Sequence, residues 1–445
     1  MPLNTSYRQI LSISTPIMLG SAAQNVIALS DSVFLYHLSE ADFASIGFIG
    51  VFYLVVAAIG YGFSRGGQIM IARRMGEGRP EEVGRTFYAL VYFELALAVV
   101  LFLFMQYGCY YFFQLLVNSE VVFAKSMEYL TYRSWGVFFS YTGVAIIALY
   151  TGIARTTFII VDTVILATVN ILLNYALIFG HWGLPAMGIG GAGLASTISE
   201  AVALVVFMVY ILFDKKAVLY HLFTLPKIDF ELIKLQYRLS APIVAQAIVG
   251  LGSWFAFFSI VENMGERPLA ITNLARMVYL VLSIPTWGFA SGVNTLVSNF
   301  IGARKRQAVV PIIWKTARLC WLTTMLLTAP VVLFPETMLY PLLGSEDMSL
   351  IHDAQPVFFV LVGVLTLFSI GGVFFNGLAG TGATYFGLKI QTFSVILYVV
   401  YIYIVVEFVE GSLELAWAGE IFYWAFMLVM TIGYLRSKLW YEVEV

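Results

Sequence analysis

The feature that most constrains this chain is a series of apolar segments that recurs from one end to the other. A helix of about 20 apolar residues spans the hydrocarbon core of a bilayer. Twelve such segments can be marked, near 12–36, 44–70, 86–107, 127–150, 160–180, 189–213, 239–262, 269–300, 314–334, 354–379, 387–408 and 412–436. Only 11% of the 445 residues are charged, against about 25% in soluble proteins. The sequence predicts an all-α integral membrane protein of twelve transmembrane helices.

Lysine and arginine are concentrated in every second loop between the segments. The loops after the even-numbered segments are basic, as in residues 73–85 and 304–306, whereas the alternate loops contain only Lys125 and Arg267. Under the positive-inside rule, the even-numbered loops and both termini face the cytoplasm. The first apolar stretch lacks the short core of a cleavable signal and is interpreted as a retained helix. We expect a multi-pass protein of the plasma membrane, the inner membrane of a bacterium.

The two halves of the chain repeat each other. Pro16 recurs as Pro242, a shift of 242 − 16 = 226. The same shift relates Ser14, Gly62, Gly66 and Gly76 to Ser240, Gly288, Gly292 and Gly302, and a shift of 225 relates Gly152 to Gly377. Six spans per half make the repeats parallel, with a symmetry axis along the membrane normal. We expect an N-terminal six-helix lobe (1–213), a cytoplasmic linker (214–238) and a C-terminal six-helix lobe (239–445), pseudo-symmetric around a central cleft.

One carboxylate lies inside the first segment. Asp31 follows the almost wholly apolar and small run from Ile17 to Ser30. A charge at the bilayer centre costs roughly 2.5–3.5 kcal/mol on insertion scales, so its default interpretation is a functional site. We expect Asp31 to bind a cation or a proton. Two alternatives are a carboxylate that only holds helices together and one that contacts substrate directly.

Three neutral polar side chains are expected at the depth of Asp31, which lies ~7 Å below the outer end of its helix at the helical rise. Asn170 and Asn174 stack on one face of the fifth segment, and Ser196 lies at a comparable depth in the sixth. One carboxylate with neutral oxygens suits either a proton or a sodium ion. If the ion is sodium, we expect Asp31, Asn170 and Asn174 to be its ligands. The rival interpretation of the neutral residues is interhelical hydrogen bonding, worth ~0.6 kcal/mol on average.

The second half supplies an internal control. The repeat shifts place Phe257 opposite Asp31, Val395 opposite Asn170 and Val399 opposite Asn174. The second half therefore has the scaffold without this polar cluster, and we expect the coupling site in the first lobe.

Several runs resemble the multidrug and toxic compound extrusion (MATE) family. They are Ser14-Thr15-Pro16-Ile17 leading to Leu29-Ser30-Asp31-Ser32, Gln68-Ile69-Met70-Ile71-Ala72-Arg73-Arg74-Met75-Gly76, Val169-Asn170-Ile171-Leu172-Leu173-Asn174-Tyr175, and Gly190-Gly191-Ala192-Gly193-Leu194-Ala195-Ser196. The resemblance covers nearly the whole chain and is of prokaryotic type. It implies an ion-driven efflux antiporter with two six-helix lobes. Carried over by position, its cation or proton site is Asp31, Asn170, Asn174 and Ser196.

The chain departs from the family pattern in two ways. Many members have Asp where Asn174 stands. Some also have a Glu in helix seven and an Asp in helix ten, where this chain has Gly250 and the region of Phe368. These departures put a coupling site in the second lobe in doubt.

Further ionisable residues lie in the apolar segments. Glu200, one turn past Ser196, could extend a proton path, meet a cationic substrate or pair with a neighbour. Glu94 and Glu420 are further candidates, and Arg276 and Arg133 are possible partners for such acids.

Pro16 interrupts the hydrogen bonding of its helix and can bend it about fifteen residues below Asp31. The functional interpretation is a hinge whose bend depends on neutralisation of Asp31. The alternative is a static kink, which Pro242 at the matching position favours equally.

Catalysis is not expected. The run Gly62-Phe63-Ser64-Arg65-Gly66 fits the hydrolase pattern G-x-S-x-G, but it lies in a membrane helix and its repeat has Ala290 in place of the serine. The four histidines fall outside the twelve marked segments and are expected in loops. We expect no enzyme activity and no cofactor other than sodium or a proton as coupling ion.

The sequence therefore predicts a secondary active exporter of amphipathic or cationic, drug-like organic compounds, coupled through Asp31. Its expected partners are this small substrate and membrane lipids, with no nucleic acid, and the chain is expected to be a monomer. Two alternatives stay open. One is a flippase for a lipid-linked saccharide, on a related fold, and the other is a non-transporting membrane receptor or scaffold.

Overall fold

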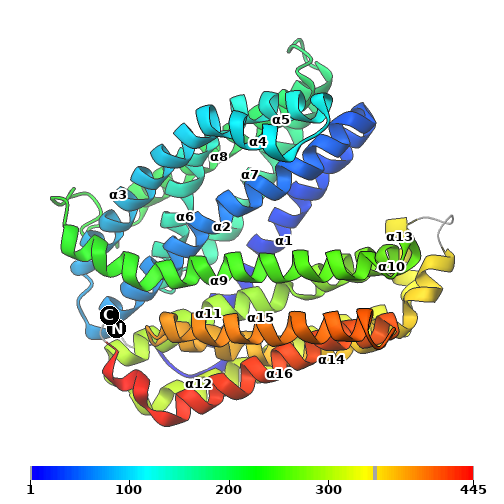
Figure 1. Cartoon of the computed structure of the whole chain (residues 1–445). Coiled ribbons are helices and arrows are strands. Elements are labelled where there is room, and N and C mark those ends of the chain that lie inside the picture. The colour runs from blue at the N-terminus through cyan, green and yellow to red at the C-terminus, as the bar shows by residue number, and fades with distance from the viewer. Residues whose placement is uncertain (1–2, 344–347, 444–445) are drawn as a thin grey trace. The chain divides into compact units, whose positions relative to one another are not determined.

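The computed structural model describes residues 3–343 and 348–443, and the regular structure in them is helical (Figure 1). The N-terminal half comprises α1 (Tyr7–Leu38), α2 (Glu40–Glu77), α3 (Glu82–Leu103), a π-helical turn (Phe104–Gly108), α4 (Cys109–Leu116), α5 (Glu120–Arg133), α6 (Gly136–Gly152), α7 (Thr157–Phe179) and α8 (Gly188–Phe213). The second half comprises α9 (Phe230–Glu262), α10 (Glu266–Leu282), α11 (Ile284–Gly302), α12 (Val309–Leu333), α13 (Pro335–Leu343), α14 (Met348–Gly380), α15 (Thr384–Glu407) and α16 (Leu413–Ser437), with short 3-10 turns at Arg306–Ala308 and Leu439–Glu442.

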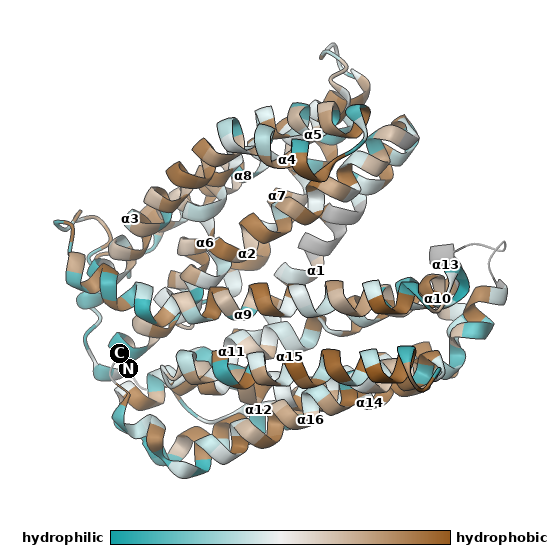
Figure 2. Ribbon diagram, in the orientation of Figure 1, coloured by the Kyte–Doolittle hydropathy of each residue, from teal (hydrophilic) through white to brown (hydrophobic). Residues whose placement is uncertain are grey.

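Membrane-length helices account for the twelve apolar segments. In the described residues, 9 helices are long and apolar enough to cross a membrane, or up to 11 if each of two bent helix pairs is one span. The first predicted segment, 12–36, lies inside α1, which is longer at both ends and has 32 residues. Figure 2 shows apolar residues along the middle of the helices and hydrophilic residues mainly near their ends.

Two of the spans are broken rather than continuous. α5 and α6 meet at a bend of 56°, and α10 and α11 at one of 43°. Pro285 in the first turn of α11 explains the second break, because proline suits the start of a helix and not its interior. At the first break, Gln106 of the π-helical turn donates to Ser134 Oγ (2.7 Å) and to the Thr131 carbonyl (3.3 Å). The side chain of Gln106 thus supplies hydrogen bonds to a backbone carbonyl and a hydroxyl at the end of α5.

The chain forms two compact units, and α1 and α9 each contribute to both. Unit 1 is Met1–Met18 with Pro242–Val445, and unit 2 is Leu19–Ala241. The first turns of each long helix therefore belong to the unit built mainly from the other half of the sequence. The lobes predicted along the chain, 1–213 and 239–445, remain a prediction of its organisation.

Hydrogen bonds within each unit fix the N-terminal parts of α1 and α9 to the unit that each of them joins. In unit 1, the Leu3 amide donates to Asn299 Oδ1 (2.9 Å) and Lys315 Nζ to the Thr5 carbonyl (2.6 Å). In unit 2, Gln236 Nε2 donates to the Thr86 carbonyl and Ser240 Oγ to the Phe63 carbonyl, both at 3.1 Å. The exchange is reciprocal and involves matching parts of the repeat.

This exchange explains two of the repeated residue pairs. A Cβ added at Gly66 would overlap Ser240 Oγ, and a Cβ added at Gly292 would overlap Ser14 Oγ. Gly66 and Gly292 are related by the repeat shift, as are Ser14 and Ser240. Each glycine lets the first helix of the opposite repeat approach closely, which is the usual role of small residues between membrane helices.

The outer part of α1 is fixed in a hydrophobic cluster of unit 2. Leu35, one turn after Asp31, is fully buried in a cluster that includes Phe113, Ile178 and Ile189. These residues come from α4, α7 and α8. The packing sets the rotation of α1 and thereby the face on which Asp31 lies.

Candidate functional site

A chain of hydrogen bonds joins the four predicted site residues. Asn174 Nδ2 donates to Asp31 Oδ1 and to Asn170 Oδ1, the latter at 3.1 Å. Asn170 Nδ2 in turn donates to Ser196 Oγ at 3.1 Å. Residues of α1, α7 and α8 therefore converge at one level of unit 2. We call these four residues the polar cluster.

The polar cluster offers an incompletely satisfied set of oxygens. Asn174 and Asn170 are 0% and 1% exposed, and Asp31 is half-buried. Asn174 Oδ1 is buried and makes no hydrogen bond among the described residues. A buried acceptor without a donor costs about 1–3 kcal/mol, so it calls for a ligand. A hard cation, which prefers carboxylate and carbonyl oxygens, fits such a group.

No cluster of three or more His, Cys, Asp or Glu side chains that could hold a metal ion is found in residues 3–343 and 348–443. The polar cluster contains one carboxylate and three neutral side chains, so it lies outside that pattern. Its single negative charge matches a single monovalent cation or proton.

An ion pair stands beside the cluster. Arg133 Nη1 and Nη2 donate to the two carboxylate oxygens of Glu200 at 2.7 and 2.6 Å, and the guanidinium lies 3.9 Å from the Tyr53 ring centroid. The pair interacts electrostatically with Asp31. Of the three roles considered for Glu200, the structure shows pairing with a neighbour, and it shows Arg133 as that partner. Whether Glu200 also belongs to a proton or substrate path stays a prediction.

Three glycines allow the helices around the polar cluster and the ion pair to pack closely. A Cβ at Gly136 would overlap Arg133 Nη1 and lie 2.8 Å from Glu200 Oε2. A Cβ at Gly191 would lie 2.6 Å from the Leu177 carbonyl oxygen, and one at Gly193 would lie 2.7 Å from that of Tyr129. α8 can therefore approach α5 and α7 closely, as expected of small residues in membrane helices.

The other predicted residues lie apart from the hydrogen-bond chain of the polar cluster. Glu94, 0% exposed, accepts a hydrogen bond from Ser64 Oγ (2.8 Å), and its Oε2 makes no hydrogen bond among the described residues. Ser64 of the hydrolase-like run is thus a partner of a buried acid. Arg276 is exposed in α10, 5.3 Å from the Phe258 ring centroid. Pro16 lies within α1, two residues before the last residue that α1 contributes to unit 1.

Sequence reasoning missed one buried acid. Asp162, near the start of α7, is 5% exposed, and its Oδ1 makes no hydrogen bond among the described residues. The signal was available, because Asp162 lies inside the predicted segment 160–180 and ionisable residues in such segments are rare.

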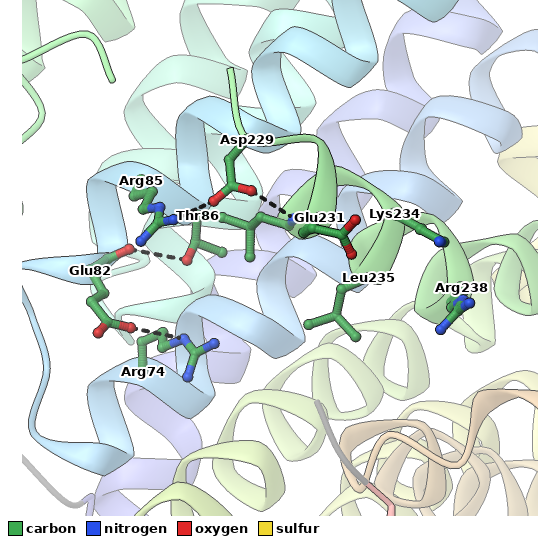
Figure 3. Close-up of a pocket in the computed structure, with 10 residues that line it drawn as sticks. Arg74, Glu82, Arg85, Thr86, Asp229, Glu231, Lys234, Leu235 and Arg238 are labelled. Carbon is green, nitrogen blue, oxygen red and sulfur yellow. Dashed lines mark hydrogen bonds and ion pairs between the residues drawn. The ribbon is translucent and has the colours of Figure 1, made fainter. Parts of the chain in front are cut away.

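A pocket of about 590 Å³ lies in unit 2 among the residues of the basic loops. Figure 3 shows Arg74, Arg85, Lys234 and Arg238 around it. Arg74 pairs with Glu82 at 3.3 Å, and Arg85 pairs with Asp229 at 2.5 Å. Asp229 also accepts a hydrogen bond from the Leu232 amide at the start of α9. This hydrogen bond, and after it the one from Arg85, holds the pKa of Asp229 below its usual range. The paired charges join α2 to α3, and α3 to the residue just before α9, a structural role.

Comparison with a family model gives a match over both halves of the chain. The model of the MatE family matches residues 16–176 and again 242–404. The two stretches begin at Pro16 and Pro242, which are related by the repeat shift. The family unit therefore occurs twice.

Curated relatives match at low identity. One, named probable multidrug resistance protein NorM, from Thermotoga maritima, is 22% identical over 97% of this chain and 93% of its own length. A protein of the same name from Agrobacterium fabrum is 25% identical over 63% of this chain, and the match spans 60% of that relative. One from Bacillus subtilis, named probable multidrug resistance protein YoeA, is 26% identical over 69% of this chain and 68% of its own length.

Solved structures share the fold. A structure described as the outward-facing conformation of a multidrug resistance MATE family transporter of the MOP superfamily superposes with a TM-score of 0.87, at 19% identity, over 97% of this chain and 95% of that one. A structure of MATE in complex with MaL6 superposes with a TM-score of 0.85, at 20% identity and the same coverage. The expected fold class, a helical membrane protein with twelve spans in two six-helix halves, is confirmed.

Proposed function

Because the chain belongs to the MatE family, we propose that it is a secondary active efflux antiporter that exports organic compounds in exchange for sodium ions or protons. Membership confirms the family resemblance and makes the chain a multi-pass membrane transporter rather than an enzyme. The relatives named as multidrug resistance proteins support drug-like small molecules as substrates. The coupling ion, its site and the substrate class are the proposed part.

The observation that carries the proposal is the hydrogen-bond chain of the polar cluster. Asp31 would supply the charge, and the unsatisfied Asn174 Oδ1 a neutral ligand. Ser196 and Asn170 would either supply further oxygen ligands or keep Asn174 in position through their hydrogen bonds. These are groups that bind a hard monovalent cation, and Asp31 alone suffices for a proton.

Binding of either ion would neutralise Asp31. An uncompensated charge in a membrane interior is costly, so neutralisation changes the relative stability of any two conformations that solvate Asp31 differently. In the exchange cycle, the ion enters from outside and stabilises one conformation, and the substrate binds the other. A ligand shifts such an equilibrium only by its differential affinity for the two states.

Pro16 is the proposed hinge of this cycle, because it lies within α1 between the residues of unit 1 and Asp31. Glu200, Glu94 and Arg276 remain proposals for a proton or substrate path. The exporter would reside in the bacterial inner membrane with both termini in the cytoplasm, and we expect it to act as a monomer.

The test is transport by the purified chain in proteoliposomes, with sodium and pH gradients imposed separately. Asp31→Asn keeps the size and hydrogen bonding of the side chain and removes its charge, so efflux should lose its dependence on both gradients. Asp353→Asn, an exposed acid paired with Arg267 in unit 1, is the matched control and should behave as wild type. Undiminished ion-driven efflux by Asp31→Asn would falsify the proposed site. A flippase would instead move a lipid-linked saccharide without export of the organic compound.

A further inference from the structure

The pocket among the basic loops of unit 2 is lined by two cations that have no acidic partner. Of its four basic side chains, Arg74 and Arg85 are joined to acids. None of the ion pairs in residues 3–343 and 348–443 includes Lys234 or Arg238. Figure 3 shows these two side chains on α9, beside the pocket. Their charges are therefore available to a ligand.

The charge and size of the pocket fit a small anionic group. Its lining holds four basic and three acidic side chains, a net charge of 4 − 3 = +1. Lys234 and Arg238 are four residues apart and lie on one face of α9, where like charges destabilise a helix. The volume of about 590 Å³ lies in the usual range of ~300–1,000 Å³ for ligand sites. A ligand with one negative charge would balance the pocket.

The second half of the chain lacks this set of charges. The repeat shift of 226 relates three arginines of the pocket to uncharged residues: Arg74 to Phe300, Arg85 to Pro311 and Arg238 to Ser12. Lys234 alone of the four cations has a basic counterpart, Arg8. Basic loops that only orient the chain in the membrane are needed by both halves. A basic pocket in one half therefore calls for a further explanation.

The linker beside the pocket lies against a helix of membrane-spanning length. Tyr88 Oη donates to the Leu222 carbonyl, and Tyr92 Oη donates to the Pro226 carbonyl at 3.1 Å. Both tyrosines belong to α3, within the candidate span Glu82–Leu116. The linker, which the sequence predicts to be cytoplasmic, thus runs along the first turns of a helix that is expected to cross the membrane.

The same stretch of the linker exposes large apolar side chains. Phe223, Leu225, Ile228 and Phe230 are 50%, 74%, 55% and 75% exposed. Asp229, which lines the pocket, lies between the last two. Grouped exposed apolar side chains mark a contact with a membrane or a partner, and the position beside α3 favours the acyl chains of lipids. An apolar surface therefore adjoins the basic pocket.

We propose that the pocket and the apolar linker bind an anionic glycerophospholipid of the cytoplasmic leaflet. Its phosphodiester contacts Lys234 and Arg238, and its acyl chains lie along residues 223–230. Basic pockets between helices on the cytoplasmic side are typical sites for such headgroups. A soluble phosphate ester would use the pocket and leave the apolar linker uncovered. The competing interpretation is a solvated basic face without a ligand.

The inference goes beyond the proposed function, because it concerns a lipid and not the coupling ion or the exported compound. The side of the membrane follows from the expected topology. Lipid binding is measured without an ion gradient or a substrate, so failure of the coupling site at Asp31 leaves the test of the lipid site unaffected.

The test is thermal unfolding of the purified full chain in detergent, titrated with phosphatidylglycerol, whose headgroup carries one negative charge. The lipid should stabilise wild type in a saturable manner, and phosphatidylcholine, which has no net charge, should have little effect. Lys234→Gln/Arg238→Gln should raise the half-saturating concentration about 30-fold, because each basic side chain contributes about fivefold. Equal stabilisation by the two lipids would overturn the proposal.

Two controls separate this site from diffuse charge attraction and from a soluble ligand. Lys215→Gln/Lys216→Gln removes two exposed cations of the linker that do not line the pocket, and should titrate as wild type. An equal weakening by both double variants would contradict a site at the pocket. Glycerophosphoglycerol, the same headgroup without acyl chains, should not stabilise at concentrations where the lipid saturates. Equal stabilisation by it would assign the pocket to a soluble phosphate ester.

The apolar half of the site has its own variant. Leu225→Ser should weaken phosphatidylglycerol binding about threefold, because it removes an apolar contact with the acyl chains. Leu326→Ser, a leucine of α12 in unit 1 with the same exposed fraction of 74%, is the matched control and should titrate as wild type. If the double variant at Lys234 and Arg238 does not fold, an unchanged titration of Leu225→Ser overturns the proposal.

Discussion

The two units each hold a carboxylate among packed membrane helices, Asp31 on α1 in unit 2 and Glu420 on α16 in unit 1, in opposite surroundings. In unit 2, Asp31 is linked to Asn174, Asn170 and Ser196 through amide and hydroxyl groups. In unit 1, Glu420 accepts a hydrogen bond from Tyr398, whose ring contacts those of Phe257 and Tyr423. Oxygen ligands favour small hard cations, and aromatic packing does not supply them. A duplicated scaffold thus permits a cation site in one unit without requiring one in the other.

The largest effect is expected from the ion pair beside the polar cluster. Arg133→Met leaves the Glu200 carboxylate without the two hydrogen bonds it now accepts. Breaking a buried pair costs about 3–5 kcal/mol, which should appear as a lower free energy of unfolding in detergent.

The double variant Arg133→Met/Glu200→Gln is the control for this comparison, because it also removes the stranded charge. It should recover most of the lost stability. Equal stabilities of the single and double variants would mean that the charge of Glu200 is not what makes the single variant unstable.

The second prediction concerns the ligand role of Asn174. Asn174→Ala removes the unsatisfied Oδ1 and the donor to Asp31. If the coupling ion is sodium, its affinity should fall about 10–100-fold, measured as sodium-dependent thermal stabilisation. If it is a proton, loss of the donor favours neutral Asp31, so proton-driven efflux should extend to higher pH. Val399→Ala, at the matching place in unit 1, should change neither, and an equal effect there would remove the contrast between the units.

The third prediction concerns the aromatic packing of unit 1. Phe257, fully buried, stands opposite Asp31 in the repeat and contacts Trp417 (5.2 Å between centroids) as well as Tyr398. Phe257→Leu should lower the free energy of unfolding by about 1–2 kcal/mol. Sodium or proton dependence of efflux should stay as in wild type. A loss of ion dependence would contradict the assignment of coupling to unit 2 alone.

The smallest effect is expected at an acid outside both sites. Burial alone would raise the pKa of Asp214, but hydrogen bonds from Arg155 and the Lys216 amide outweigh it and hold that pKa below its usual value of 3.8. A lowered folded-state pKa stabilises the protein above the unfolded-state pKa, and this stability is lost as pH falls through the folded-state value. Asp214→Asn should therefore reduce the loss of stability below about pH 4, followed by unfolding at several pH values. An unchanged pH dependence would contradict the role of Arg155.

The sequence predicted those features that depend on position along a helix. The twelve segments and the common depth of Asp31, Asn174 and Ser196 follow from span length and helical rise, and the hydrogen bonds of the polar cluster agree with that depth. Features that depend on helix rotation were harder to predict, because helices that are apolar all round carry little signal of orientation. The pair of Arg133 with Glu200 was one of several options, and the aromatic packing of Tyr398, which donates to Glu420, was not predicted.

The break between α5 and α6 was also outside the reach of the sequence, unlike the break between α10 and α11, which Pro285 marks. The bend between α5 and α6 follows Arg133 without a proline, and the adjacent glycine, Gly136, is already the first residue of α6. Its polar groups are met by Gln106, a residue far away in sequence. A tertiary contact of this kind has no local signature.

The reciprocal packing of α1 and α9 has a consequence for gene fusion and division. A fragment ending at residue 213 would carry Leu3 and Thr5, which bond to Asn299 and Lys315 of the missing fragment. It would lack Gln236 and Ser240, which donate to carbonyls of its own α3 and α2. Neither half can complete its compact body alone, so separately expressed halves should assemble only when both are made together. An ancestral single repeat would have met the same need by pairing with a second copy of itself.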